Sequence, residues 1–159
     1  GIRAELIDGQ IFYFAFPKLV HQELLMELSN SLYNYVKMNG GKCKVLFAPF
    51  GVRLIEDRKN HLEPDILVVC DKNKLSEDGC HGAPDLIIEV VSPSTKKRDY
   101  GIKLLKYRTA GVKEYWIVDP MRETVMVYWF EDEEQNCLYG MREEISFHLF
   151  PDLSVRLME

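Results

Sequence analysis

The chain has 159 residues, of which 47% are hydrophobic and 28% are charged. These values are typical of a soluble globular protein, and the length suits a single domain covering residues 1–159. No apolar run approaches the roughly 20 residues needed to cross a bilayer, and no basic-then-apolar signal segment opens the chain. We therefore expect a cytoplasmic protein with no membrane partner. The net charge of −5 argues against a protein that coats nucleic acid through bulk positive charge.

The charge is unevenly distributed along the chain. Residues 96–113 hold seven basic side chains and one acidic side chain, Asp99. The basic residues are Lys96, Lys97, Arg98, Lys103, Lys106, Arg108 and Lys113. A local positive surface can therefore exist despite the acidic average.

The four cysteines are Cys43, Cys70, Cys80 and Cys137, and no two of them form a CxxC pair. His61 and His81 could be imagined beside them as ligands, but the spacing fits no zinc motif. We predict reduced thiols, as in a cytosolic protein, rather than a disulfide scaffold or a zinc site.

The first half of the chain predicts a hairpin, a long helix and several strands. Asp8-Gly9 supplies the positive φ angles that a tight hairpin turn needs. Pro17 and Gly40-Gly41 suit the two ends of a helix with apolar residues at helical spacing. The predicted elements are a hairpin of residues 5–7 and 10–13, a helix at 18–39, strands at 44–47, 52–55 and 66–69, and a polar loop at 71–83.

The second half predicts a crossover followed by a β-meander. A strand at 84–91 precedes a helix at 97–110 that ends at Gly111, and a strand at 114–119 follows. Strand, helix and strand with short links indicate a right-handed βαβ crossover. Strands at 124–130 and 137–141 surround the acidic EDEEQN loop, and shorter strands at 145–147 and 153–157 end the chain.

Two carboxylates lie inside the strongly apolar strand at 84–91. Strand side chains alternate between faces, so Asp85, Ile87 and Glu89 share one face of the sheet. A carboxylate between Ile88 and Val90 costs much free energy to bury unless a cation or several donors accompany it. Glu89 is therefore a candidate metal ligand; a buried structural ion pair with Lys103 or an arginine is the alternative.

Asp65, at the entrance of the strand at 66–69, is the best partner for Glu89. Asp85 lies four residues from Glu89, roughly 13 Å along a strand, which is too far to share one metal ion. If the two strands pair, Asp65 lies beside Glu89 at the strand spacing of about 4.8 Å. The backbone carbonyl of Val90 could add a third oxygen ligand. A turn residue is the alternative role for Asp65, and a strand-entry turn is the expected role for Asp85.

Lys103, on the helix after the strand, could bring an ammonium group to the same place. Two carboxylates, a lysine and Mg²⁺ or Mn²⁺ suit metal-assisted attack of water on a phosphodiester. Lys96, Lys97 and Arg98 could contact neighbouring phosphates without reading sequence. A solvated surface lysine is the alternative role for Lys103.

Three segments carry a resemblance to a known family. EPDILVV (63–69), PDLIIEVVSPSTKKRDYGIKLLKY (84–107) and AGVKEYWIVDP (110–120) resemble the Uma-type family of restriction-endonuclease candidates, long catalogued as a domain of unknown function. That family is a branch of the PD-(D/E)XK nuclease superfamily. The likeness extends from the ELIDG hairpin through Pro120.

The resemblance implies an α/β fold with a restriction-endonuclease-like three-layer core, in which helices flank a mixed β-sheet. It implies Asp65 and Glu89 as the motif acids and Lys103 as the helix lysine. The wider superfamily has a lysine where this chain has Val91, and the Uma-type branch moves it to the following helix. Gln22 and Glu23 stand where the superfamily often has a helix side chain near the metal.

The expected function is metal-dependent hydrolysis of DNA, and a homodimer would supply the two sites that a double-strand cut needs. The alternative is an inactive module that binds nucleic acid or a protein on the same fold. Ser92 and Ser94 suit a turn or a helix cap, because no G-x-S-x-G elbow surrounds them. Asp99 suits a cap or an ion pair on its helix, and His21 suits a packed helix position.

Overall fold

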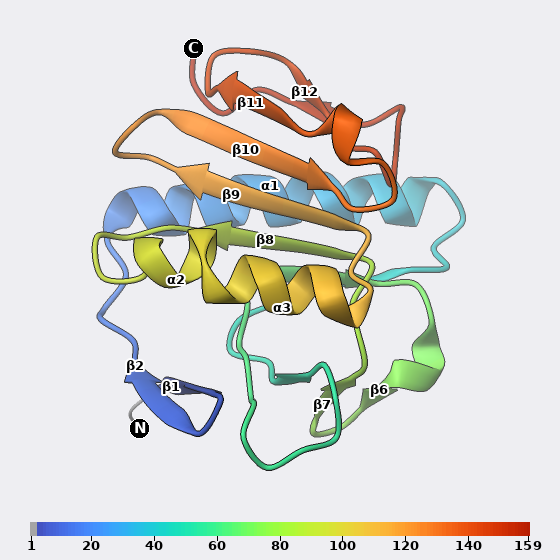
Figure 1. The fold of residues 1–159 in the computed structure, drawn as a ribbon. Helices are drawn as coiled ribbons and strands as arrows, with labels where there is room; N and C mark the ends of the chain where they lie inside the picture. The colour runs from blue at the N-terminus through green and yellow to red at the C-terminus, as the bar shows by residue number, and fades with distance from the viewer. Residues whose placement is uncertain (1–2) are drawn as a thin grey trace.

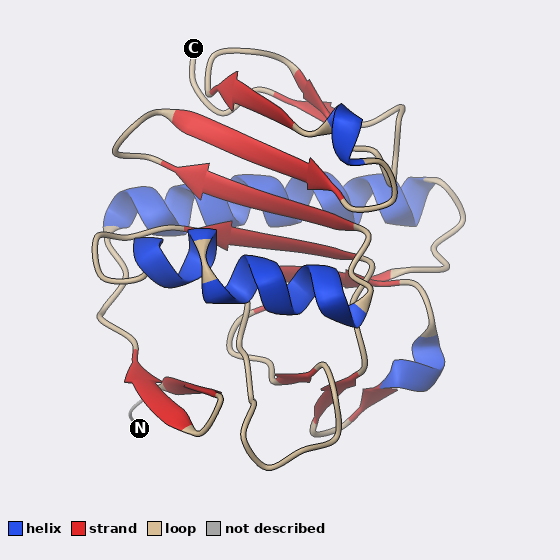
Figure 2. Cartoon of the chain, viewed as in Figure 1, coloured by secondary structure: helices blue, strands red, loops and turns tan. Residues whose placement is uncertain are grey.

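A computed structural model describes residues 3–159. Its centre is a six-stranded mixed sheet in the order β11-β10-β9-β8-β5-β3 (Figures 1 and 2). β8 and β9 are parallel, and every other neighbouring pair is antiparallel. The strands are β3 (Lys44–Phe47), β5 (Ile66–Val69), β8 (Leu86–Val90), β9 (Glu114–Asp119), β10 (Thr124–Trp129) and β11 (Cys137–Gly140).

Helices cover both faces of this sheet. Figure 1 shows α1 (Leu19–Met38) behind it, with α2 (Lys96–Tyr100) and α3 (Ile102–Ala110) in front. Alternation along β8 divides its side chains between two apolar clusters, with Ile88 toward α1 and Ile87 toward α3. The predicted three-layer core is therefore confirmed, as is the strand–helix–strand crossover from β8 to β9.

The first long helix agrees with the prediction. Its buried residues recur every four positions, which places them on one side of the helix. These residues are Leu24, Leu28, Leu32 and Val36. Burial of each leucine stabilises the fold by roughly 1.5–3 kcal/mol, and the N-terminal turn of the helix is thereby held at the end of the sheet where β5 begins.

The helix predicted at 97–110 is two helices, because the chain bends at Gly101. The φ and ψ angles of Gly101 are −112° and −100°, outside the helical region. A Cβ atom at Gly101 would lie 2.8 Å from the backbone oxygen of Lys97, so a larger residue would force the backbone to move. Lys103 still lies within ion-pair distance of Asp99 across the bend.

The N-terminal hairpin is confirmed and packs at the edge of the core. β1 (Ala4–Ile7) and β2 (Gln10–Tyr13) pair around Asp8 and Gly9, whose φ angles are 49° and 82°. Leu6 and His61 exchange two backbone hydrogen bonds of 2.9 and 2.8 Å. This pairing holds β1 against the segment that leads into β5.

The segment predicted as a loop at 71–83 has regular structure instead. It contains the 3₁₀ helix η1 (Lys72–Lys74) and the strands β6 (Leu75–Ser76) and β7 (Gly79–His81). The strand predicted at 52–55 is limited to β4 (Val52–Arg53), which pairs in parallel with β7. β7 lies about 28 residues after β4, and the polar composition of residues 71–83 did not indicate that this segment pairs with β4.

The C-terminal meander of β9, β10 and β11 is confirmed, with the 3₁₀ helix η2 (Glu133–Gln135) in the acidic loop. The last two strands, β12 (Ile145–Ser146) and β13 (Ser154–Val155), form a separate pair. Within residues 3–159, no helix is both long and apolar enough to cross a membrane.

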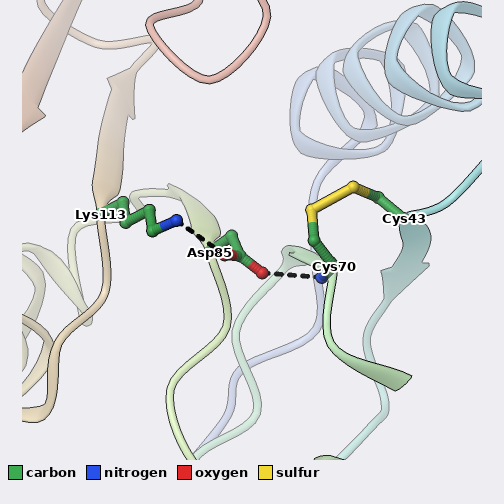
Figure 3. Close-up of a disulfide and its surroundings, with 4 residues drawn as sticks. All are labelled: Cys43, Cys70, Asp85 and Lys113. Carbon is green, nitrogen blue, oxygen red and sulfur yellow. Dashed lines mark hydrogen bonds and ion pairs between the residues drawn. A yellow bond between two sulfur atoms is a disulfide. The ribbon is translucent and has the colours of Figure 1, made fainter. Parts of the chain in front are cut away.

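A disulfide joins Cys43 and Cys70, so the expectation of four reduced thiols is wrong for these two (Figure 3). Antiparallel pairing places Lys44 opposite Val69, and the two cysteines are the next residues along the strands. The backbone N–H of Cys70 donates a 2.7 Å hydrogen bond to Asp85, whose other oxygen lies 3.6 Å from the ammonium of Lys113. Asp85 thus has the structural role expected of it. Cys80 and Cys137 are free.

We expect alkylation of the denatured, unreduced protein to label two thiols, and four after reduction. Replacing both bonded cysteines with serine should lower the free energy of unfolding by roughly 2–4 kcal/mol, because the disulfide closes a loop between residues 27 positions apart. Urea denaturation measures this loss, with Cys137→Ser as the control. Labelling of four thiols without reduction would show that the bond does not form.

Candidate active site

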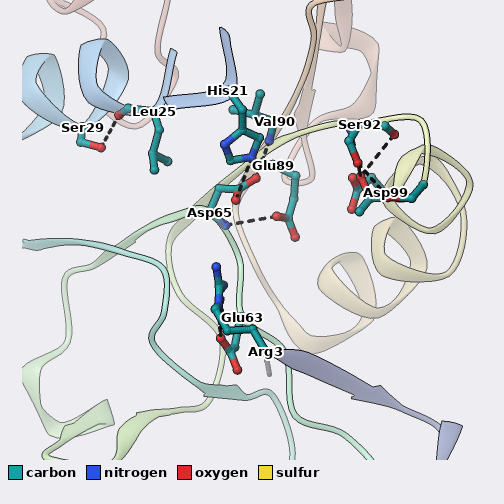
Figure 4. A network of polar contacts seen from close by, with 12 residues as sticks. Arg3, His21, Leu25, Ser29, Glu63, Asp65, Glu89, Val90, Ser92 and Asp99 are labelled. Carbon is teal, nitrogen blue, oxygen red and sulfur yellow. Dashed lines mark hydrogen bonds and ion pairs between the residues drawn. The ribbon is translucent and has the colours of Figure 1, made fainter. Parts of the chain in front are cut away.

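Asp65 and Glu89 lie next to each other at one end of the sheet, as predicted (Figure 4). The backbone N–H of Asp65 donates to Glu89 Oε1 at 3.1 Å, and the N–H of Val90 donates to Asp65 Oδ2 at 2.7 Å. The antiparallel register of β5 and β8, with Ile66 opposite Ile88, produces this pairing. Two acids that are 24 residues apart in sequence therefore share one location.

Lys103 reaches the same location from α3. Lys103 is 2% exposed, and its ammonium contacts Glu89 directly. The same ammonium lies 3.0 Å from Glu5 and 3.5 Å from Asp99. Val91 occupies the position where the wider superfamily has its lysine, and it is buried in the apolar cluster under α3. In this chain, Lys103 is therefore the lysine that meets Glu89. The alternative of a solvated lysine is excluded.

Glu5 and Tyr107 belong to this cluster, although the sequence had not indicated them. Glu5, on β1, is 1% exposed and accepts hydrogen bonds from Lys103 Nζ at 3.0 and 3.1 Å. It also accepts from the backbone N–H of Glu63 at 2.9 Å. Tyr107 donates its hydroxyl hydrogen to Glu89 Oε2 at 2.9 Å. The available signals were the ELIDG likeness for Glu5 and, for Tyr107, a position one helical turn after Lys103, but neither signal assigned a partner.

Negative charge exceeds positive charge in this buried cluster. Burial raises the pKa of Glu89 well above its usual value, and the neighbouring Asp99, Asp65 and Glu5 add to the shift while Lys103 opposes it. Burial likewise raises the pKa of Asp99 to about 6. Burial alone would lower the pKa of Lys103, but its three carboxylate neighbours outweigh burial and raise it. An added cation near Glu89 and Asp65 would reduce this imbalance.

His21, rather than Gln22 or Glu23, is the α1 residue beside Asp65. Its Nε2 lies 3.3 Å from Asp65 Oδ1, and this hydrogen bond raises the pKa of His21. Its Nδ1 is buried and has no hydrogen-bond partner among residues 3–159. Gln22 and Glu23 are exposed, and neither side chain contacts the cluster in the described part of the chain. The helix therefore turns His21 toward Asp65, and the accessory role expected of Gln22 and Glu23 stays a prediction without a contact to support it.

The three basic residues at the start of α2 separate into two groups. Arg98 stacks on Phe12 of the hairpin, 4.6 Å from the ring centre, and donates to the backbone oxygen of Ser94 at 3.2 Å. Lys96 and Lys97 instead line an open groove. Arg98 thus attaches the hairpin to α2, which leaves Lys96 and Lys97 as the candidates for phosphate contact.

Ser92, Ser94 and Thr95 form a turn. The backbone N–H of Ser92 donates to Thr95 Oγ1 at 3.0 Å, and the Ser92 and Ser94 hydroxyls lie 3.1 Å apart. These contacts agree with the turn-making role predicted for the serines. They end β8 directly after the Glu89 site.

The donor set at Asp65 and Glu89 fits a hard divalent cation. Each Asp65 oxygen, and Glu89 Oε1, meets one hydrogen-bond donor among the described residues, so each keeps a lone pair free. No group of three or more His, Cys, Asp or Glu side chains within residues 3–159 is arranged to hold a metal. Mg²⁺ commonly uses one or two protein carboxylates and completes its shell with water and substrate oxygens. Two carboxylates are therefore sufficient for such a site.

Comparison with known proteins agrees with this fold. A family model described as "Uma2: Putative restriction endonuclease" matches residues 1–157. An uncharacterized protein of Synechocystis sp. is 26% identical over 130 residues, which cover 81% of this chain and 67% of that protein. The crystal structure of a "putative nuclease belonging to DUF820" from Anabaena variabilis has a TM-score of 0.78. At 20% identity, the likeness covers 97% of this chain and 87% of that one, and it supports the restriction-endonuclease-like fold. The chain belongs to the Uma2 family.

Proposed function

We propose that this protein is a metal-dependent endonuclease that hydrolyses DNA phosphodiester bonds with water as the nucleophile. Its family and its structural neighbour support a nuclease-like function. The observation that carries the finer proposal is the meeting of Asp65, Glu89 and Lys103 at one end of the sheet. Two carboxylates and an amine are the groups that metal-assisted phosphodiester hydrolysis uses.

Asp65 and Glu89 would hold Mg²⁺ or Mn²⁺, together with the backbone carbonyl of Val90. When bound, the metal would lower the pKa of a water molecule and offset the negative charge that develops on the phosphate. The protein prepares these ligands, because the N–H groups of Asp65 and Val90 fix the two carboxylates relative to each other. His21 orients Asp65 from α1.

Lys103 would supply positive charge that favours the ionised form of Glu89, and it would assist the attacking water or the transition state. Its ammonium is held by Glu5 and Asp99 as well as by Glu89, so it cannot rotate freely. Tyr107 donates to the Glu89 oxygen that also meets Lys103. Glu5 and Tyr107 are therefore positioning residues, which act through Lys103 and Glu89.

DNA, as the proposed partner, would enter at the end of the sheet where β8 and β9 both finish. Ligands of open α/β sheets characteristically bind beyond the carboxyl ends of parallel strands. A homodimer is part of the proposal, because two copies of the site would be needed to cut both strands of a duplex.

Plasmid nicking tests this function. Wild-type protein should convert supercoiled plasmid to open-circular DNA with Mg²⁺ or Mn²⁺, and EDTA should stop the reaction. Glu89→Gln should lose this activity. Glu134→Gln is its matched control, because it makes the same change at a residue that is exposed in the loop between β10 and β11. Absence of nicking with either metal would leave the fold as a binding module and would contradict the proposal.

A further inference from the structure

A basic groove lies beside the candidate active site, and the proposed function does not account for it. It is open to solvent, has a volume of about 470 Å³, and is lined by Pro93, Lys96, Lys97, Tyr100, Gly101 and Arg122. This volume falls in the range of pockets that hold drug-sized ligands, so the groove is larger than one phosphate ion requires.

The three cations of the groove come from two separate segments of the chain. Lys96 and Lys97 begin α2, and Arg122 belongs to the turn between β9 and β10. Figure 1 shows α2 and this turn at the same end of the sheet. None of the three forms an ion pair with another of the residues described. Their charges are therefore available to an external anion.

A buried carboxylate, Asp119, connects the two chain segments that form the groove. Asp119 is 0% exposed and accepts a hydrogen bond from the Tyr100 hydroxyl at 3.4 Å and one from the backbone N–H of Arg122 at 3.3 Å. It thereby attaches the end of α2 to the turn that carries Arg122. Because Asp119 is buried, it connects the two segments that line the groove without facing the groove's solvent-exposed cations.

The groove and the candidate active site share α2. Asp99 and Tyr100 are neighbours in sequence, yet Asp99 is buried beside Lys103 whereas Tyr100 lines the groove. Pro93 of the groove follows Glu89 by four residues. A strand bound at Glu89 could therefore continue over α2 toward Arg122.

We infer that this groove binds the phosphodiester backbone of the nucleic-acid strand that enters the candidate active site. Lys96, Lys97 and Arg122 contact its phosphates, and the ring of Tyr100 provides a flat wall for a sugar or base. The inference rests on the proposed function for the identity of the strand. It adds Arg122, which lies outside the basic run of residues 96–113, and it excludes Arg98.

The experiment measures binding without cleavage. A fluorescein-labelled 20-base-pair DNA duplex is titrated with protein in EDTA, and fluorescence anisotropy gives the affinity at several salt concentrations. The test variant is Lys97→Ala with Arg122→Ala, and the control is Lys42→Ala with Lys44→Ala. Both remove two positive charges from exposed residues, but Lys44 lies opposite Val69, at the other end of the sheet from Asp65.

The groove variant should bind on the order of tenfold or more weakly than wild type, with a salt dependence shallower by about one to two phosphate contacts. The Lys42/Lys44 control should stay within about twofold of wild type. Circular dichroism of both variants excludes misfolding, and Arg122→Lys should retain most of the affinity because the charge remains.

Equal losses in the two double variants, unchanged binding by the groove variant, or no binding by wild type would each overturn the inference. Metal-dependent nicking by wild type, together with unchanged binding by the groove variant, would reject the groove and keep the nuclease. Weakened binding by the groove variant, without nicking by wild type in any metal, would keep the groove and reject hydrolysis.

Discussion

Glu89→Gln should reduce metal-dependent nicking by about a thousandfold while the protein remains folded. Glutamine has nearly the shape of glutamate: its amide oxygen can accept the hydrogen bond from Asp65 N–H, and its amide NH2 can donate to the Tyr107 hydroxyl oxygen. It has no negative charge, so it cannot offset a divalent cation at this place, and losses of this size are typical when one electrostatic group of an active site is removed. Initial rates of plasmid nicking over a range of Mg²⁺ concentrations measure the effect.

Two further variants make this result interpretable. Asp65→Asn should cause a comparable loss, because Asp65 is the other proposed carboxylate ligand, whereas Glu134→Gln should nick as wild type does. Urea denaturation should show Glu89→Gln close to wild type in stability, because the substitution also removes repulsion from Asp99, Asp65 and Glu5. Wild-type nicking by Glu89→Gln would indicate a contaminating nuclease or a different active site.

Lys103→Met should destabilise the protein by roughly 3–5 kcal/mol at pH 8, because removal of one partner leaves buried charges uncompensated. The ammonium of Lys103 is the only cationic group in contact with Glu5, Glu89 and Asp99 among the residues the structure describes. Methionine nearly preserves the length and volume of the side chain, so lost packing contributes little. Urea denaturation measures the loss, with exposed Lys42→Met as the control.

The loss should become smaller as the pH falls. Burial raises the pKa of Asp99 to about 6, against about 3.9 in an unfolded chain, and Lys103 opposes that shift. A carboxyl group with a raised pKa in the folded state stabilises the fold below its unfolded pKa, and this contribution disappears as the pH rises through the folded pKa. Without Lys103 the pKa of Asp99 is higher still. The variant should therefore regain stability between pH 8 and pH 5 more steeply than wild type does.

The same loss of stability at pH 5 and pH 8 would contradict this account, as would a variant as stable as wild type at pH 8. If Lys103→Met does not fold at pH 8, the comparison begins at pH 5. There the carboxyl groups of Asp99 and Glu89, whose pKa values are raised, bind more protons than at pH 8, and the folded population should be measurable.

Local sequence pattern predicted the central part of the site. Alternation of apolar residues placed Glu89 inside a buried strand, and the short apolar run after Asp65 predicted the strand next to it. Apolar side chains on both faces require both strands to be covered, so the carboxylates had to lie near the core. The convergence of Asp65 and Glu89 followed once these strands paired.

Local pattern could not predict the residues that complete the site. Glu5 and Lys103 are 98 residues apart, and their contact depends on the docking of the hairpin through Leu6 and His61. His21 meets Asp65 because of the rotation of α1 on the sheet, which selects one of three consecutive polar residues. Such contacts depend on packing angles, which hydrophobic periodicity leaves undetermined.

The disulfide and the bend at Gly101 are two further features that local sequence pattern did not predict. Cys43 and Cys70 have no motif spacing, and they meet because the register of β3 and β5 makes them opposite neighbours. Residues 97–110 have helix-forming composition apart from Gly101, where the chain changes direction and a Cβ atom would lie 2.8 Å from the Lys97 backbone oxygen.

Short-range periodicity and the motif segments were sufficient to predict the order of the main elements, the layered α/β core and the candidate site residues Asp65, Glu89 and Lys103. The packing of distant segments, in contrast, places Glu5, Asp99 and Tyr107 around the Glu89–Lys103 pair, His21 beside Asp65, and Arg122 in one groove with Lys96 and Lys97. The physical reason is that the burial and charge of these groups depend on which distant segments pack against them.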